Sequence, residues 1–539
     1  MKKLIIFMAA VFAVAALNAQ NLDPTVEVSR VYEGKLIEVH KPAIEMAVPD
    51  TLYRFDLDFG YSVFDKTYKG SYEFNPYMLD MRPESNLQSP SQFYLRAGAG
   101  YTLHPTFDLL WSPVFNKPLS VNVYGIHRSY VGGYRALMGN EAFNGYDLFS
   151  KAGADFGYDW KKVALDFGAS YYGVAVKDLF KNRSYNAVDA YAVVSSKALY
   201  DKQFMYNIAL DYRFADDCAP QRVSEHDLSV ASVFGPSFDA NNRISFDLGV
   251  DLNAYTGALE ATATRLYLVP HYAYEHGILD LSLGFRLSAA LLSTEFKKNQ
   301  YIYPDIRMNL AVIPDAMRLY VNIGGGEKLN SYASLIGRDH HTDLSYALDG
   351  PSALMQPSVE RVSAELGIEG RISGFFSYNL RGGYVNYAQE LFDMMVKGED
   401  VLYRPFIGYS NAQKYYASLD WDMNFQDLRF DGNVSYSHYW GMDKMCFAPS
   451  ELTGDVRVLY NWRKRVYAGV DCDFALARTN GEDLKVPGFA DLGVYAEYVL
   501  NKKISFWLRG GNLMNMEIQR NLLYAEKGIN FTAGICLNF

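Results

Sequence analysis

The chain has 539 residues, a formal net charge of −10 at pH 7 and 15% aromatic residues, including 43 Tyr and 33 Phe. The negative charge argues against nucleic acid as a partner, because binding to the phosphate backbone requires a basic surface. Only four Cys occur, none in a C-x-x-C arrangement, so we expect no disulfide framework and no metal site of the zinc type. No cofactor is predicted.

The N-terminus has the pattern of a secretory signal peptide. Lys2 and Lys3 precede the apolar stretch LIIFMAAVFAVAAL, and no Cys follows it. We therefore expect residues 1–19 to be a signal peptide that is removed on export. Residues 20–92 contain several prolines and are predicted to be an extended segment in the periplasm or in a lumen. No other stretch reaches 18 apolar residues, so no helical membrane span is predicted.

From residue 93 onward the sequence repeats alternating apolar and polar segments of about ten or more residues. Each segment has the pattern of a strand with one apolar and one polar face, and 22 such strands are predicted. Their ranges are 93–103, 106–113, 119–130, 145–158, 163–174, 186–200, 203–214, 222–235, 243–255, 264–275, 278–289, 299–313, 316–326, 358–371, 374–387, 413–424, 427–440, 449–462, 465–476, 486–499, 503–512 and 528–539.

The connections alternate in length. Tight turns such as DWKK (159–162) and WRKR (462–465) follow even-numbered strands, and longer segments such as 175–185, 327–357 and 388–400 follow most odd-numbered ones. Bacterial outer-membrane barrels combine an even strand number with short periplasmic turns and long external loops. Residues 401–412 are interpreted as an external extension of the strand that follows them.

The faces of the strands indicate what surrounds them. In 278–289, the residues Leu279 to Leu287 at odd positions are apolar, and the intervening side chains are polar, charged or glycine. A hydrocarbon environment cannot satisfy the hydrogen bonds of an open sheet edge, so such strands must close into a ring. We expect the last strand to close against the first, with Phe539 at the periplasmic rim. Aromatic residues near strand ends are expected to form interfacial aromatic girdles, among them Trp421, Trp440, Trp462 and Trp507. The predicted fold class is therefore all-β: a transmembrane antiparallel β-barrel over residues 93–539.

The last hairpin carries a resemblance. Gly511, Asn512, Leu513 and Asn515 match a Gly-Asn-Leu-x-Asn stretch common before the last external loop of TonB-dependent receptors, and the whole range 93–539 is similar to that family, in particular to Bacteroidota members that lack a full plug. The resemblance implies an outer-membrane transport barrel. It also implies that residues 20–92, which are too few for the family's plug domain, form a reduced plug or none.

One short segment within residues 20–92 bears on whether transport through the barrel is driven by TonB. Thr25, Val26, Glu27, Val28 and Ser29 (TVEVS) stand where a TonB box would stand in the family. The alternative is that this segment is a plain extended arm. If it is a TonB box, import is driven by TonB; if it is not, passage through the barrel is passive.

Charged residues on the polar faces are the candidate site residues. They are Arg96, Asp247, Asp251, Asp280, Arg286, Asp420, Asp422, Asp471 and Asp473. Such charges could bind or filter a solute, or opposite charges on neighbouring strands could brace a wide ring, and the bracing interpretation is favoured. His340 and His341 are interpreted as solvated loop residues rather than metal ligands. No catalytic motif was found, and an enzymatic function is not predicted.

Two functions remain open from the sequence. The first is a transport-type barrel for passage of a solute or ligand across the outer membrane. The second is a non-transport barrel subunit of an outer-membrane assembly, secretion or surface complex. The expected partners are outer-membrane lipid and either TonB or a surface or periplasmic lipoprotein.

Overall fold

The computed structural model describes residues 92–101, 103–115, 118–135, 137, 142–177, 182–197, 203–218, 222–239, 241–292, 301–314, 316–341, 355–397 and 403–539. The predicted signal peptide (1–19), nearly all of the predicted N-terminal segment (20–92) and the TVEVS stretch lie outside the described residues. Within the described residues, no helix is long and apolar enough to cross a membrane.

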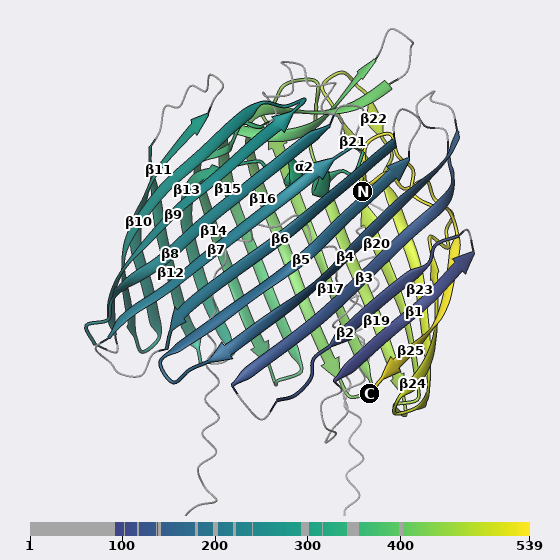
Figure 1. Ribbon diagram of the computed structural model, residues 1–539, viewed down its shortest axis with the longest axis horizontal. Coiled ribbons are helices and arrows are strands. Elements are labelled where there is room, and N and C mark those ends of the chain that lie inside the picture. Colours follow the sequence, from purple (N-terminus) through teal and green to yellow (C-terminus); the bar gives the residue numbers. More distant parts are fainter. Residues whose placement is uncertain are drawn as a thin grey trace, which may run out of the picture. The chain divides into compact units, whose positions relative to one another are not determined.

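Twenty-two long strands form one antiparallel sheet that closes on itself (Figure 1). Each strand pairs with its neighbours in chain order, and β1 pairs with both β2 and β25. The strands are β1 (Phe93–Tyr101), β2 (Thr106–Trp111), β3 (Leu119–Tyr134), β4 (Phe143–Asp159), β5 (Val163–Lys177), β6 (Asn182–Ser196), β7 (Phe204–Asp217), β8 (Val223–Pro236), β9 (Asn242–Gly257), β10 (Ala261–His276), β11 (Leu279–Leu292), β12 (Ile302–Ile313), β13 (Met317–Lys328), β14 (Ser358–Ile372), β15 (Phe376–Lys397), β16 (Tyr403–Phe425), β17 (Leu428–Trp440), β19 (Leu452–Trp462), β20 (Val466–Ala475), β23 (Phe489–Asn501), β24 (Ile504–Gly511) and β25 (Asn530–Asn538).

Four short elements lie in the longer connections. They are α2 (Tyr332–Arg338), β18 (Cys446–Phe447), β21 (Arg478–Thr479) and β22 (Lys485–Val486). Together with the long hairpin of β15 and β16, they lie at one end of the barrel, the upper end in Figure 1. We call this the loop end. The opposite end, where the C-terminus and most of the short turns lie, is called the turn end.

The ring closes between the first and last strands, as the sequence predicted. The register runs from Tyr94 opposite Asn538 to Tyr101 opposite Phe531. At the turn end, the carbonyl oxygen of Phe539 accepts hydrogen bonds from the N–H groups of Gln92 (2.6 Å) and Phe93 (3.0 Å). Closure leaves no unpaired edge in the ring of described strands, which is the condition for a sheet in hydrocarbon.

The number and order of the predicted strands are confirmed, since each predicted range overlaps one observed strand. The predicted loops at 175–185 and 388–400 are largely wrong. β5 continues to Lys177 and β6 already begins at Asn182, while β15 continues to Lys397. The strands project past the apolar band as paired hairpins, where the alternation that marks a lipid-facing strand is lost. The interpretation of 401–412 as an extension of the next strand is confirmed, because β16 begins at Tyr403.

The two faces of the ring differ in chemistry. On β11, the outward side chains of Leu283, Phe285 and Leu287 are 45%, 46% and 36% exposed. The alternate positions on the same strand carry Asp280 and Arg286 and face the lumen. An apolar outer band around a polar interior is the arrangement of membrane-spanning barrels.

Tyrosine rings lying over glycines recur on the lumen face. A Cβ atom placed on Gly153, Gly249 or Gly367 would meet the ring of a tyrosine on the adjacent strand within 2.9 Å. The rings are those of Tyr124, Tyr267 and Tyr320. Glycine thus leaves room for a large ring to lie flat against the wall, a device that pins strand register.

The ring of Trp507 also lies over glycines on the lumen face, so its predicted place in an outer aromatic girdle is wrong. It pairs with Glu497 on the lumen face, is 5% exposed, and its ring lies over Gly98 and Gly534. Aromatic residues near a strand end suit both faces of a barrel, and only the register decides between them.

Candidate functional site: the lumen wall and the loop-end mouth

Most of the predicted lumen charges have an opposite charge or a polar group on a neighbouring strand. Arg265 Nε donates to Asp251 at 2.7 Å, and Arg429 Nη2 donates to Asp422 at 2.9 Å. The other pairs are Asp420 with Arg381 (3.3 Å), Asp471 with Arg509 (3.5 Å), Arg286 with Asp305 (3.6 Å), Asp247 with His271 (3.8 Å), Asp280 with Asn309 (3.1 Å) and Asp473 with Arg520. The charges are spread around the ring and do not converge on one point.

Arg96 differs from the others because its neighbours are aromatic. Its guanidinium carbon lies 4.1 Å from the ring centre of Trp507 and 5.5 Å from that of Tyr495. A guanidinium over an aromatic face gains cation–π attraction. Arg96 therefore joins β1 to β23 and β24 across the seam where the ring closes.

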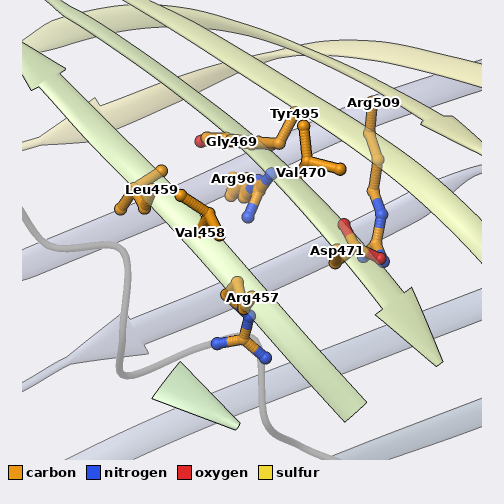
Figure 2. A pocket seen from close by; sticks show the side chains of 9 residues that line it. All are labelled: Arg96, Arg457, Val458, Leu459, Gly469, Val470, Asp471, Tyr495 and Arg509. Atoms are coloured by element: carbon orange, nitrogen blue, oxygen red, sulfur yellow. The ribbon is translucent and has the colours of Figure 1, made fainter. Parts of the chain in front are cut away.

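Figure 2 shows the surroundings of Arg96, with Asp471 beside Arg509 and with Arg457 on a different strand. The hollow between these side chains measures about 20 Å³, which is room for about one water molecule. A second hollow of about 480 Å³ lies at the turn end and is lined by Arg318, Glu369, Asp420 and Asp422 among others. The first hollow is too small for a small-molecule ligand, and the second has several charged side chains in its lining.

The mouth at the loop end has a more specific construction. Helix α2 begins after Ser331, whose side chain accepts a hydrogen bond from the N–H of Ser334 at 3.1 Å, a normal N-cap. Tyr332, Ala333, Leu335 and Ile336 on this helix are buried. They pack in one apolar cluster with residues of β5 to β9 and with Leu391 and Ile407 of the β15–β16 hairpin. We call residues 329–341 the lid segment.

A buried acid holds the first turn of α2. Glu225 on β8 is fully buried and accepts hydrogen bonds from the N–H groups of Tyr332 (2.8 Å) and Ala333 (2.9 Å). These two donors would otherwise be without partners at the helix N-terminus. Burial and the neighbouring charge of Asp227 raise the pKa of Glu225 well above its ordinary value.

A second buried group lies beside it. Arg183 on β6 and Asp217 on β7 form an ion pair at 3.0 Å, with side-chain exposures of 1% and 0%. The hydroxyl of Tyr332 donates to the same Asp217 carboxylate, and Arg183 Nη1 donates to the carbonyl oxygen of His340 at 2.8 Å. The strand wall therefore binds both the beginning and the end of the lid segment. Glu225, Arg183 and Asp217 together are called the lid anchor.

The far side of the lid segment contacts the other loops. Arg338 Nη2 pairs with Asp393 of β15 at 3.0 Å, and Arg478 of β21 pairs with the same carboxylate at 3.2 Å. The ring of His341 stacks on Tyr524 of the last connection, with centroids 3.5 Å apart. The lid segment thus joins the strand wall, the long hairpin and the last loop.

The predicted solvation is wrong for His341, whereas the His340 side chain is 25% exposed and so is partly solvated. His341 is 4% exposed, and His340 Nδ1 lies 3.4 Å from Asp147 of β4. Burial lowers the pKa of His340, but the hydrogen bond and charge of Asp147 outweigh it, so the pKa is raised above its ordinary value. Within the described residues, no group of three or more His, Cys, Asp or Glu side chains is arranged to hold a metal ion.

Sequence reasoning missed the lid anchor. Arg183, Asp217 and Glu225 lie more than 100 residues before the helix that they hold. The available signal was weak: each is a charge near the loop end of a strand where a polar face was expected anyway.

Comparisons with known proteins match the fold. No family model matches the chain, and no curated protein matches it in sequence. Among solved structures, the chain is similar to the copper transporter OprC (11% identity, 85% of this chain and 82% of that one, TM-score 0.63). It is also similar to the FrpB iron transporter from Neisseria meningitidis (10%, 84% and 83%, TM-score 0.63) and to FpvA of P. aeruginosa bound to pyoverdines (9%, 84% and 72%, TM-score 0.62).

The chain has the barrel fold of these proteins. At 9–11% identity the likeness is one of architecture, and the sequence prediction of that architecture is confirmed. It extends over most of both chains, so the whole ring is matched rather than a group of strands.

Proposed function

We propose that this chain is a transport-type barrel of the bacterial outer membrane that passes a solute or ligand through its lumen. The observation that carries the proposal is the closed ring of 22 strands with an apolar outer face and a charged inner face. A ring of this size is wide enough to enclose a passage. The turn end then faces the periplasm and the loop end faces the exterior.

The loop-end mouth gives the proposed passage a gate. The lid segment is docked between the strand wall and the long hairpin, and the lid anchor supplies the polar contacts that hold it. Release of this segment would open the external side of the lumen. The neighbours in the structure comparison are named as transporters of copper and iron, which supports transport, and we propose no catalytic role.

The proposed test is conductance in planar bilayers, using four forms of the protein. They are the full mature chain, a form lacking residues 20–91, a form in which residues 331–341 are replaced by a Gly-Ser linker, and a form with both changes. If the barrel passes a solute, we expect low conductance for the full chain and steady large currents for the form with both changes. The single changes show which segment closes the lumen, and hence whether residues 20–91 act as a reduced plug.

If the form with both changes folds normally but shows no conductance, transport would be contradicted. The barrel would then be a structural subunit of an outer-membrane complex, the second function open from the sequence.

TonB is the proposed energy source if TVEVS is a TonB box. Val26→Pro should then abolish energised uptake while leaving the conductance of the barrel unchanged, because a proline removes the backbone donor that strand pairing with TonB needs. Uptake that survives this change would show that TVEVS is a plain arm.

A further inference from the structure

Two neighbouring hairpins at the turn end carry an exposed group of cations. The turn between β19 and β20 and the turn between β23 and β24 are adjacent in the ring, because β20 pairs with β23 and the N–H of Val499 donates to the carbonyl oxygen of Arg465 at 2.8 Å. We call their five exposed cationic side chains the basic rim: Arg463, Lys464, Arg465, Lys502 and Lys503.

The charge of the basic rim is not neutralised within the described part of the chain. No ion pair there involves any of its five members, and the ammonium of Lys503 instead lies 5.3 Å from the ring centre of Phe539. The next turn in the ring contains Asp427, and it contacts this sector through its backbone carbonyl, which accepts from the N–H of Asn461 at 2.7 Å. The cations are therefore available to a ligand from outside the chain.

The backbone of the first turn does not favour the residues it carries. Arg463 and Lys464 have φ angles of 53° and 56°, in the left-handed region that suits Asn and Gly. The comparable turns after β10 and β14 place Gly277 and Gly374 at such positions. The Asn461 side chain fixes this turn by accepting from the N–H of Lys464 at 2.8 Å. An ordinary Asn-Gly turn would form more easily but would lack both charges.

An aromatic belt lies next to the basic rim on the outer face. It consists of Tyr460 and Trp462 on β19, Tyr498 on β23 and Phe506 on β24, all about half exposed. Tyr498 is directly opposite Phe506 in the ladder. Tyrosine and tryptophan prefer the level of the lipid headgroups, where one part of the ring is apolar and the other is wet. The belt therefore places the basic rim at headgroup depth.

We propose that the basic rim and the aromatic belt bind the anionic headgroup of a phospholipid in the leaflet at the turn end. Five long cationic side chains can reach one or two phosphate groups, while the belt contacts the first carbons of the acyl chains. Basic clusters beside membrane-spanning segments recognise anionic lipid in the same way. The inference depends on the proposed membrane placement but not on transport, and a barrel that conducts nothing would still have this site.

The test uses the full mature chain in mixed micelles, with phosphatidylglycerol and phosphatidylethanolamine as probes and native mass spectrometry as the readout of retained lipid. One variant, Arg463→Asn with Lys464→Gly, suits the turn better than the natural residues and should fold. A second is Lys502→Gln with Lys503→Gln. The matched control, Lys161→Gln with Lys162→Gln, removes two charges from the turn between β4 and β5. This turn lies at the turn end of the barrel but outside the basic rim.

The natural protein should retain phosphatidylglycerol in preference to phosphatidylethanolamine, and the preference should fall about fivefold for each cation removed from the basic rim. The control variant should keep the full preference for phosphatidylglycerol. Equal retention of the two lipids by the natural protein would overturn the proposal and leave an acidic protein as the partner of the rim. Loss in the control equal to that in the rim variants, or full displacement of the lipid by inorganic phosphate, would also overturn it.

Discussion

Removal of the Glu225 carboxylate tests whether the lid anchor holds the mouth closed. In Glu225→Ala, the N–H groups of Tyr332 and Ala333 lose acceptors at 2.8 Å and 2.9 Å. A buried donor left without an acceptor costs about 1–3 kcal/mol, so two of them amount to about 2–6 kcal/mol. Even the lower figure shifts the ratio of docked to undocked lid by roughly thirtyfold.

Hydrogen exchange of the lid segment measures this shift directly. We expect amides of residues 332–338 to exchange at least about thirtyfold faster in Glu225→Ala than in the natural protein, while the strands stay protected. Glu369→Ala is the matched control, because Glu369 pairs with Arg318 at the turn end in a partly exposed ion pair worth at most about 1 kcal/mol. Unchanged exchange of the lid in Glu225→Ala, with a folded barrel, would refute the assignment of the anchor.

Three further predictions follow from other contacts. Asp217→Leu leaves Arg183 buried without its partner and should destabilise the docked lid by about 3–5 kcal/mol, whereas the double change Arg183→Leu with Asp217→Leu should restore much of the loss; exchange that is as fast in the double variant as in the single one would argue against a buried pair. The raised pKa of His340 means that docking favours its protonated form, so the stabilisation from Asp147 is complete below about pH 6.5 and is lost as the pH rises through the docked pKa. The exchange of the natural lid relative to His340→Gln should therefore be slow at pH 6, and the difference should shrink as the pH rises through the docked pKa. A ratio independent of pH would contradict the pairing with Asp147; Asp339 and Arg183 are the other charged groups that act on His340. Gly98→Val places a Cβ 2.4 Å from the ring of Trp507 and 2.8 Å from the carbonyl oxygen of Ala533, so the closing seam should be destabilised by about 1–3 kcal/mol, measured as a lower temperature of heat modification on gels. Gly125→Val, whose nearest neighbour would be 3.8 Å away, is the control that should retain the natural temperature.

The strands were predictable because their signal is local. Period-two alternation, as in Leu283, Phe285 and Leu287, reports a face in contact with lipid, and hydrocarbon tolerates few exceptions to it. The closure of β25 on β1 followed from the same argument, since hydrocarbon leaves no other place for a free edge.

The ends of the strands and the lumen contacts were harder to predict. Beyond the apolar band both faces are polar, so the extension of β15 to Lys397 left no alternation to detect. Trp507 has the residue type of a girdle, yet it lies inside because Gly98 and Gly534 leave room for its ring. That complementarity joins residues more than 400 positions apart, which a single sequence does not reveal.

For the candidate lumen charges, the sequence predicts the positions on the polar face but not the partners. Polar-face positions such as Asp251 and Asp422 could be read from alternation, but their partners Arg265 and Arg429 depend on register. The role of these charges stays a prediction, and their placement on five separate strands agrees better with bracing than with one binding point. The lid anchor required knowledge of which strands face helix α2.

Spin labels placed along β11 test the central claim, that alternate side chains face lipid and a water-filled lumen. In the reconstituted protein, labels at Leu281, Leu283 and Phe285 should collide with dissolved oxygen, and labels at Ser282 and Gly284 with a water-soluble nickel complex, so that the two accessibilities alternate out of phase. Equal exposure of all five positions to the nickel complex would show that this face contacts water and would contradict the membrane barrel.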